Sequence, residues 1–206
     1  MDFDEVARRL AASRPVFHSE ADLQHAFAWE VHSLDPNILV RLETHPEPAV
    51  RLDVLLARPD LQRHSAIELK YPTALWAGAA NGEQFALKNH GAQDITSYDI
   101  VKDVNRVEHF VSAREGWNGL VLVLTNDASY WRTPSHGRVT NAGAFRTHEG
   151  LTVTGERTWG PATGAGTMKN REAALNLRGS YDLRWRDYSR LGGRNGDFRL
   201  LVIEVA

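Results

Sequence analysis

The chain has 206 residues, of which 42% are hydrophobic and 24% charged, and its formal net charge is −2. This is ordinary globular composition, sufficient for a sizeable core, and it argues against a constitutively basic nucleic-acid coat; the absence of cysteine excludes disulfides and thiolate metal sites. The acidic start lacks an apolar segment and no apolar run reaches membrane length, so we expect a cytoplasmic protein with no membrane partner.

The N-terminal quarter predicts two helices and a strand. A short helix is expected from Phe3 to Ala12, and a better one begins after Ser19, with Asp22 at the third position of a capping box. Apolar residues then recur at helical spacing until Asp35-Pro36-Asn37 ends the helix. Residues Ile38 to Thr44 follow as a strand candidate.

Residues 51–71, RLDVLLARPDLQRHSAIELKY, predict a β-hairpin. Two β-rich apolar runs flank the turn formers Pro59 to Gln62. A turn centred on residues 60–61 places Asp53 directly opposite Glu68, with their Cβ atoms about 5 Å apart. The hairpin therefore predicts two carboxylates face to face on neighbouring strands.

Facing carboxylates repel each other, so this register predicts a neutralising cation between them. Mg²⁺ suits the position because it takes one or two carboxylates together with waters and phosphates. Glu68 and Lys70 share a face of their strand, while Leu69 turns into the core. From that face Lys70 could orient a water molecule or offset developing negative charge.

The next segment, WAGAANGEQFALKNHGA from Trp76 to Ala92, is rich in glycine, alanine and asparagine and lacks a sustained period. Two interpretations remain open for it. It is a lid over the face of Glu68 and Lys70, with Lys88, Asn89 and His90 contacting phosphate, or it is a disordered connector.

Residues Gln93 to Glu115 predict the longest helix, which Gly116 ends. Its charged residues are spaced three apart, which is most simply a solvated face: Asp99 with Lys102, and Asp103 with Arg106. Residues Gly119 to Thr125 form a continuous apolar run, typical of a strand buried on both faces.

The C-terminal third is less regular. Residues Tyr130 to Arg132 either end or extend a strand, and Phe198 to Val205 predict a terminal strand. In YDLRWRDYSR, from residue 181 to 190, Arg184 and Arg186 share one face of an extended segment. Aromatic and basic residues interleaved in this way suit nucleic acid, and an amphipathic strand with a solvated arginine face is the alternative.

At Asp53 and Glu68-Leu69-Lys70 the sequence resembles the PD-(D/E)XK, or restriction-endonuclease-like, nuclease superfamily, with Leu52 where the motif has proline. The resemblance covers about residues 19–126. It implies an α/β fold with a restriction-endonuclease-like core of helix, three-strand meander, helix and strand. We expect a single domain, 1–206, in which residues 127–206 form a β-rich C-terminal extension.

The resemblance implies a divalent-metal-dependent nuclease that hydrolyses phosphodiester bonds in DNA. Asp53, Glu68 and Lys70 would be catalytic, and Mg²⁺ or Mn²⁺ would be held by Asp53, Glu68, the Leu69 carbonyl and Glu20. Glu30 is the second choice for the helix carboxylate, and Glu20 could instead serve only the helix macrodipole.

Lys88, Arg184 and Arg186 are the candidate nucleic-acid contacts, and a homodimer is a possible assembly. Two other functions stay open. One is a catalytically inactive nuclease-fold module that binds nucleic acid, and the other is a scaffold or interaction protein whose acidic and basic halves mediate assembly.

Overall fold

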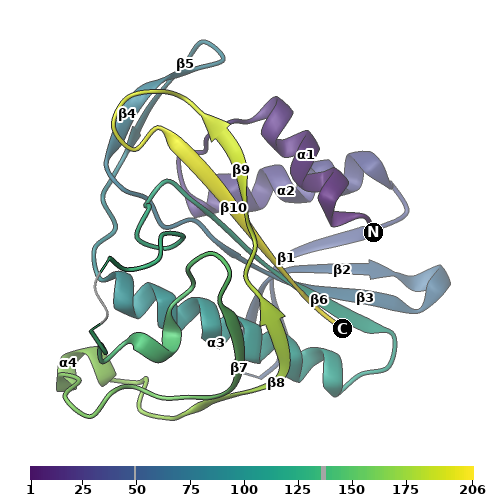
Figure 1. Cartoon of the computed structure of the whole chain (residues 1–206). Helices are drawn as coiled ribbons and strands as arrows, with labels where there is room; N and C mark the ends of the chain where they lie inside the picture. Colours follow the sequence, from purple (N-terminus) through teal and green to yellow (C-terminus); the bar gives the residue numbers. More distant parts are fainter. Residues whose placement is uncertain (49, 136–137) are drawn as a thin grey trace.

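A six-stranded mixed sheet organises the protein (Figure 1), seen in a computed structural model that describes residues 1–48, 50–135 and 138–206. Its strand order is β1-β2-β3-β6-β10-β9. Strands β3 and β6 are parallel to each other, and the other neighbouring strands of this sheet are antiparallel. The strands are β1 (Leu39–Glu47), β2 (Val50–Arg58), β3 (Arg63–Lys70), β6 (Trp117–Thr125), β9 (Trp185–Arg190) and β10 (Asp197–Val205).

Helices cover both faces of this sheet (Figure 1). Helices α1 (Phe3–Ser13) and α2 (Glu20–Leu34) pack on one face with the apolar side chains of Ile67 and Leu69. Helix α3 (Gln93–Ser112) packs on the other face with Ala66 and Val121. The predicted order of helix, three strands, helix and strand is present in part as α2, β1, β2, β3, α3 and β6, but two further strands that were not predicted, at residues 76–80 and 83–87, lie between β3 and α3.

The predicted helix start at Ser19 is also confirmed. Ser19 Oγ accepts from the Asp22 backbone N–H at 3.2 Å, which satisfies one of the free donors at the start of α2. The Asp22 carboxylate does not complete a capping box, because it binds the backbone N–H of His18 and the guanidinium of Arg14 instead.

The β2–β3 register agrees with the prediction. The pairs run from Arg58–Arg63 to Val54–Ile67, so Asp53 and Glu68 occupy the next opposed positions beyond the ladder. A single 3₁₀ turn, Pro59–Leu61, joins the strands, and Gln62 closes it in the left-handed region at φ 51°.

Strand β6 is buried on both faces along most of its length, as its apolar run predicts. Gly119 on this strand lies directly under α3. A Cβ atom at this position would come within 2.0 Å of Val107 Cγ1, so the missing side chain allows the helix to approach the sheet closely.

The prediction of a lid or a disordered connector over residues 76–92 is wrong for most of that segment. Strands β4 (Trp76–Ala80) and β5 (Glu83–Leu87) form a hairpin. Asn81 and Gly82 make its two-residue turn with φ values of 52° and 82°, the conformation that an Asn-Gly pair favours.

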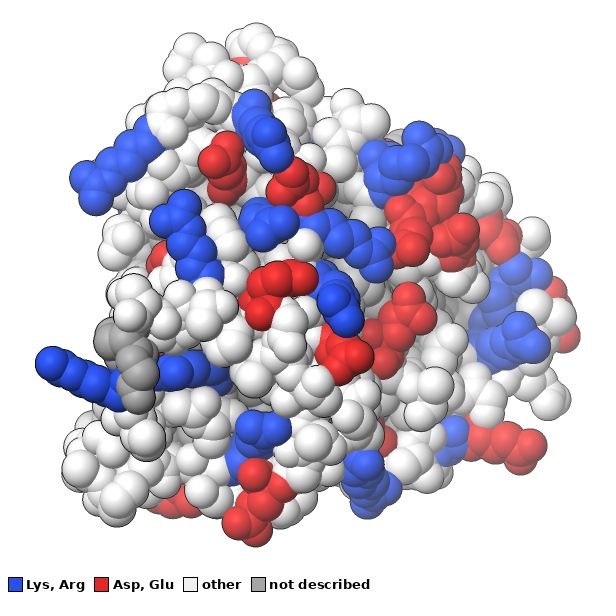
Figure 2. All heavy atoms as spheres, in the orientation of Figure 1, with Lys and Arg blue, Asp and Glu red and all other residues white. Residues whose placement is uncertain are grey.

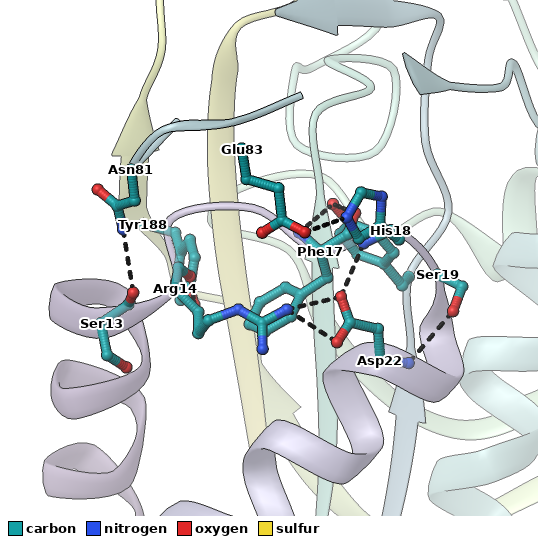
Figure 3. A network of polar contacts seen from close by, with 10 residues as sticks. Ser13, Arg14, Phe17, His18, Ser19, Asp22, Asn81, Glu83 and Tyr188 are labelled. Atoms are coloured by element: carbon teal, nitrogen blue, oxygen red, sulfur yellow. Dashed lines mark hydrogen bonds and ion pairs between the residues drawn. The ribbon is translucent and has the colours of Figure 1, made fainter. Parts of the chain in front are cut away.

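This hairpin packs against the connection between α1 and α2 (Figure 3). Asn81 Nδ2 donates to the Ser13 carbonyl at 3.1 Å, and Glu83 Oε1 lies 2.9 Å from His18 Nε2. The His18 ring also stacks on Phe85, with 4.3 Å between ring centroids. These contacts tie the hairpin to the N-terminal helices.

The C-terminal third is β-rich, and part of it continues the main sheet through β10, which pairs with β6, and β9. Strands β7 (Thr152–Arg157) and β8 (Leu175–Asp182) form a separate pair over α3, and α4 (Ala165–Met168) is one short turn. Residues 130–132 lie in a turn rather than in the predicted strand.

The Glu108 carboxylate fastens β8 to α3. It accepts from the Gly179 backbone N–H and the Tyr181 hydroxyl, each at 2.7 Å, and also from the Arg178 N–H. Glu108 is 5% exposed, and this buried carboxyl group accepts hydrogen bonds from three residues of one strand.

No helix in the described ranges has the length and apolar character needed to cross a membrane.

Candidate active site

The end of β3 places Glu68 and Lys70 on the face covered by α3. Glu68 is 1% exposed, Lys70 is half-buried, and Leu69 between them is fully buried on the opposite face. This alternation confirms the predicted orientation of the Glu-x-Lys segment. Because β3 lies between β2 and β6, the segment is held from both sides.

Asp53 reaches this segment from β2, just beyond the last ladder pair. Its Oδ2 accepts from the Leu69 backbone N–H at 2.8 Å, in place of a strand-to-strand backbone bond. Asp53 is thus fixed beside the Glu-x-Lys segment, and its direct contact is with the backbone of Leu69.

Two residues of α3 complete the cluster, and the prediction that they lie on a solvated face is wrong. Asp103 is 2% exposed and its Oδ2 lies 2.7 Å from Lys70 Nζ. Arg106 donates from Nη1 to Glu68 Oε1 at 2.6 Å, and its Nη2 lies 3.3 Å from Asp103 Oδ1. We call Asp53, Glu68, Lys70, Asp103 and Arg106 the charge cluster.

Sequence spacing carried a signal for this arrangement. Ile100 precedes Asp103 by three residues and Val107 follows it by four, so all three share one face of the helix. Both apolar residues are fully buried. A carboxylate between two core residues on a helix therefore points to the sheet.

Burial and neighbouring charges raise the pKa of two acids in the cluster, Glu68 and Asp103. Burial, followed by the nearby charges of Asp103 and Asp53, raises the pKa of Glu68 to about 9, although Arg106 acts in the opposite direction. Burial likewise raises the pKa of Asp103, opposed by Lys70 and Arg106. Glu68 therefore keeps a proton at neutral pH, and Asp103 binds a proton more readily than an ordinary aspartate does.

Lys70 shifts toward its charged form. Burial alone would lower the pKa of its ammonium group, but Asp103 and Glu20 outweigh burial and raise it. The Lys70 ammonium also donates to the Leu69 carbonyl at 3.3 Å.

Arg106 partly neutralises the carboxylates that were expected to require a metal ion. Facing carboxylates predicted a cation, and the chain itself supplies one in Arg106, bound to Glu68. What remains unsatisfied is the second carboxylate oxygen: Glu68 Oε2 is buried and has no hydrogen-bond partner among the described residues. This oxygen is the ligand atom that Glu68 would offer to a bound cation.

Glu20, at the first position of α2, also reaches the end of β3. Its Oε2 accepts from the Tyr71 backbone N–H at 2.8 Å. Although the residue as a whole is exposed, the surrounding protein excludes part of the water from its carboxylate, and this desolvation raises the pKa against the opposing effect of Lys70. Glu30, the other helix candidate, instead pairs with Arg9 of α1 at 3.0 Å.

A cavity of about 360 Å³ opens between Glu20 and Lys70. The segment after the β4–β5 hairpin forms part of its wall through Asn89, His90 and Gly91. Of the three residues expected to contact phosphate, Asn89 and His90 therefore line the cavity and Lys88 does not. The other lining residues come from the end of β3 and from α3: Tyr71, Pro72, Thr96 and Asp99.

His90 is fixed on the wall of this cavity. The Thr73 backbone N–H donates to His90 Nδ1 at 2.9 Å, and the His90 backbone N–H donates to the Thr73 carbonyl at 2.7 Å. Because a backbone N–H can only donate, Nδ1 is the acceptor and the neutral ring carries its proton on Nε2.

The β1 residue opposite Asp53, Glu43, has a left-handed backbone conformation. Glu43 has φ 55°, which interrupts regular pairing opposite Asp53. The Gln24 amide of α2 donates to Glu43 Oε1 at 2.9 Å and to the Asp53 carbonyl at 2.7 Å, and Arg51 forms an ion pair with Glu43. Gln24 thus joins α2 to the Asp53 backbone and to Glu43, the β1 residue opposite Asp53.

The candidate nucleic-acid contacts are not gathered beside the charge cluster. Arg184 and Arg186 are exposed and alternate with buried Leu183 and Trp185, but β9 is the third strand from β3, about 14 Å across the sheet. Arg186 also pairs with Asp4 of α1. Lys88 is exposed just before the segment that lines the cavity.

Several basic side chains of the C-terminal part of the chain form ion pairs with acids. On the face shown in Figure 2, Lys and Arg side chains lie among Asp and Glu side chains. Arg190 and Arg199 pair with Asp187, and Arg171 lies 3.8 Å from Asp99.

Within the described ranges, no three His, Cys, Asp or Glu side chains are already arranged as a metal-binding group. Comparison with protein-family models, curated proteins and solved structures found no match to this chain.

Proposed function

We propose that this chain is a divalent-metal-dependent nuclease that hydrolyses phosphodiester bonds in DNA. The observation that carries the proposal is Glu68 Oε2, a buried carboxylate oxygen without a hydrogen-bond partner among the described residues, in a cluster that also contains Asp53 and Lys70. An unpaired oxygen of this kind is costly to keep and is explained if a cation binds it.

The arrangement of elements supports the proposal. A helix precedes three strands, Asp53 lies on the second strand and the Glu-x-Lys segment on the third, and a helix and a parallel strand follow. This is the order and placement that the resemblance to the PD-(D/E)XK superfamily implies.

The donors available suit Mg²⁺ or Mn²⁺. Asp53, Glu68 and Glu20 offer carboxylate oxygens and Leu69 offers a carbonyl, which are the hard ligands that these ions take. When bound, such an ion polarises a phosphate oxygen and lowers the pKa of a coordinated water. The surrounding charges also favour a divalent cation, because four acidic side chains face only two basic ones. The acids are Glu20, Asp53, Glu68 and Asp103, and the bases are Lys70 and Arg106.

Lys70 is suited to stabilise charge rather than to remove a proton. Its raised pKa keeps the ammonium group charged at neutral pH, so it cannot act as a base there. Held by Asp103, it can donate to a phosphate oxygen on which negative charge develops.

The cavity beside Lys70 is a suitable place for the phosphodiester. Glu20 forms one wall, and the Nε2–H of His90 is a donor on another. A donor on a ring that is already fixed by Thr73 can bind phosphate with little loss of side-chain freedom.

A catalytically inactive binding or scaffold protein is the second candidate, and one observation favours it. Glu68 and Lys70 already have partners in Arg106 and Asp103, as they would in a purely structural charge network. Under this alternative the protein could bind DNA, but added metal would produce no cleavage.

The test is incubation of the purified protein with linear, circular and single-stranded DNA, and with RNA, in Mg²⁺, Mn²⁺ or EDTA. We expect metal-dependent cleavage that falls by orders of magnitude in Asp53→Ala, Glu68→Ala and Lys70→Ala. Glu47→Ala is the matched control, because the ion-pair partner of Glu47 is Arg114, which is not a residue of the charge cluster. A parent without activity under every condition, or a Glu68→Ala variant as active as the parent, would reject the proposal.

A further inference from the structure

One turn of α3 presents a carboxylate and a guanidinium to the Glu-x-Lys segment. Arg106 binds Glu68, Asp103 binds Lys70, and the two helix residues also lie 3.3 Å from each other. We propose that Asp103 and Arg106 are positioning residues that hold Glu68 and Lys70 in their reactive orientations. The inference rests on the proposed nuclease function and extends it to residues outside the resembled motif.

Arg106 engages only one oxygen of Glu68. Its Nη1 is 2.6 Å from Oε1, while the buried Oε2 is left without a hydrogen bond from the described residues. The same Nη1 lies 3.3 Å from the Arg51 carbonyl of β2. A planar guanidinium tied to two strands fixes the plane of the carboxylate, so that Oε2 is the oxygen left for a metal ion.

Asp103 acts in the same way on Lys70. Its Oδ2 lies 2.7 Å from the ammonium nitrogen, and the Leu69 carbonyl accepts from that nitrogen at 3.3 Å. An ammonium group has three donors, so one remains for a phosphate oxygen. Asp103 therefore limits the positions that this remaining donor can take.

Stability alone is a weak reason for these buried charges. A buried ion pair is often no more stabilising than apolar side chains of similar volume, because both charges lose their hydration. Asp103 lies between the core residues Ile100 and Val107 on α3, where an apolar side chain would pack. Placing a carboxylate there is explained if it orients Lys70.

The test measures Mn²⁺ affinity by calorimetry on metal-free protein, with melting in EDTA as the check of folding. Ligand-orienting partners typically change metal affinity 10- to 100-fold when removed, so we expect Arg106→Met to bind Mn²⁺ about 10- to 100-fold more weakly than the parent. Arg106→Lys should recover part of that loss. Asp103→Asn should lower kcat with little effect on Mn²⁺ affinity, because Asp103 holds Lys70.

Arg114→Met is the matched control. Arg114 forms an ion pair of the same length, 2.6 Å, with Glu47, and its side chain is 27% exposed, against 28% for Arg106. We expect its Mn²⁺ affinity to equal that of the parent, which separates the effect of orientation from the general loss of an ion pair.

The outcomes distinguish the inference from the function on which it rests. A parent that binds Mn²⁺ and cleaves DNA, with an Arg106→Met variant that binds Mn²⁺ equally or more tightly, would overturn the inference alone and mark Arg106 as a competitor for Glu68. A parent that neither binds Mn²⁺ nor cleaves overturns both. If Arg106→Met does not fold, Arg106→Lys decides, and an affinity unchanged from the parent counts against positioning.

Discussion

Replacing Glu68 by glutamine should change the pH dependence of folding stability in the metal-free protein. Glutamine imitates a protonated glutamate but cannot titrate. In the folded protein, burial and neighbouring charges raise the pKa of Glu68 from 4.5 to about 9. The folded state therefore binds more protons than the unfolded state between these values.

Because the folded state binds more protons, the free energy of unfolding of the parent falls as the pH rises through this window. The contribution of the protonated Glu68 is fully present below pH 4.5 and is lost as the pH rises through 9. Each pH unit inside that window changes the free energy of unfolding by at most about 1.4 kcal/mol per proton. From pH 5 to pH 8, the parent should therefore lose up to about 4 kcal/mol relative to Glu68→Gln.

The assay is urea unfolding of both proteins in EDTA at pH 5, 6, 7 and 8, compared as a difference so that the other titrating groups largely cancel. Glu47→Gln is the control, because the hydrogen bond with Arg114 lowers the pKa of Glu47 below this window, and its difference from the parent should be flat. A difference for Glu68→Gln that stays flat or falls as pH rises would show that Glu68 is ionised throughout, and the reasoning would be refuted.

Three further predictions concern other parts of the molecule. Glu108→Gln should destabilise the protein by about 1–3 kcal/mol in chemical denaturation, because a carboxylate that accepts from three donors is replaced by an amide. Gly82→Ala should cost about 1–2 kcal/mol because Gly82 has φ 82°, whereas Gly164→Ala, at φ −65° in open space, should be neutral or stabilising. In metal-free DNA binding, Arg184→Ala should flatten the dependence of log K on log salt by about 0.9 if Arg184 contacts a phosphate, and Arg186→Ala should do so less because Arg186 pairs with Asp4. An unchanged slope for Arg184→Ala would assign it to the solvated face of its segment.

Local patterns predicted the elements that position the candidate site. The turn formers at Pro59 to Gln62 set the register of β2 and β3, because a short turn leaves few ways to pair two adjacent strands. The uninterrupted apolar run of β6 predicted a strand in the interior of the sheet. Both inferences needed only neighbours in the sequence.

The β4–β5 hairpin was also predictable, although the composition of its segment suggested a loop. Asn81-Gly82 is a strong turn signal, and Trp76 and Ala80 before it alternate as Phe85 and Leu87 do after it. Abundant glycine and alanine concealed this pattern.

The sequence predicts which face of α3 is buried but not which residues that face contacts. Spacing places Asp103 on the buried face of the helix, but it does not say which strand that face covers. The partners of Asp103 and Arg106 lie more than thirty residues away, and their pairing depends on the crossover from β3 to β6. The same limit applies to β10, whose pairing with β6 joins segments far apart in the chain.

The close contact of Gly119 with α3 means that an uncharged substitution could change the geometry of the charge cluster. Gly119 pairs with Ala66, two residues before Glu68, and Val107 above it is adjacent to Arg106. A methyl group at residue 119 would push Val107 away from the sheet. This shift of α3 would move the Arg106 guanidinium away from the Glu68 carboxylate. The geometry of the charged contacts thus depends on an uncharged position that lies outside the cluster.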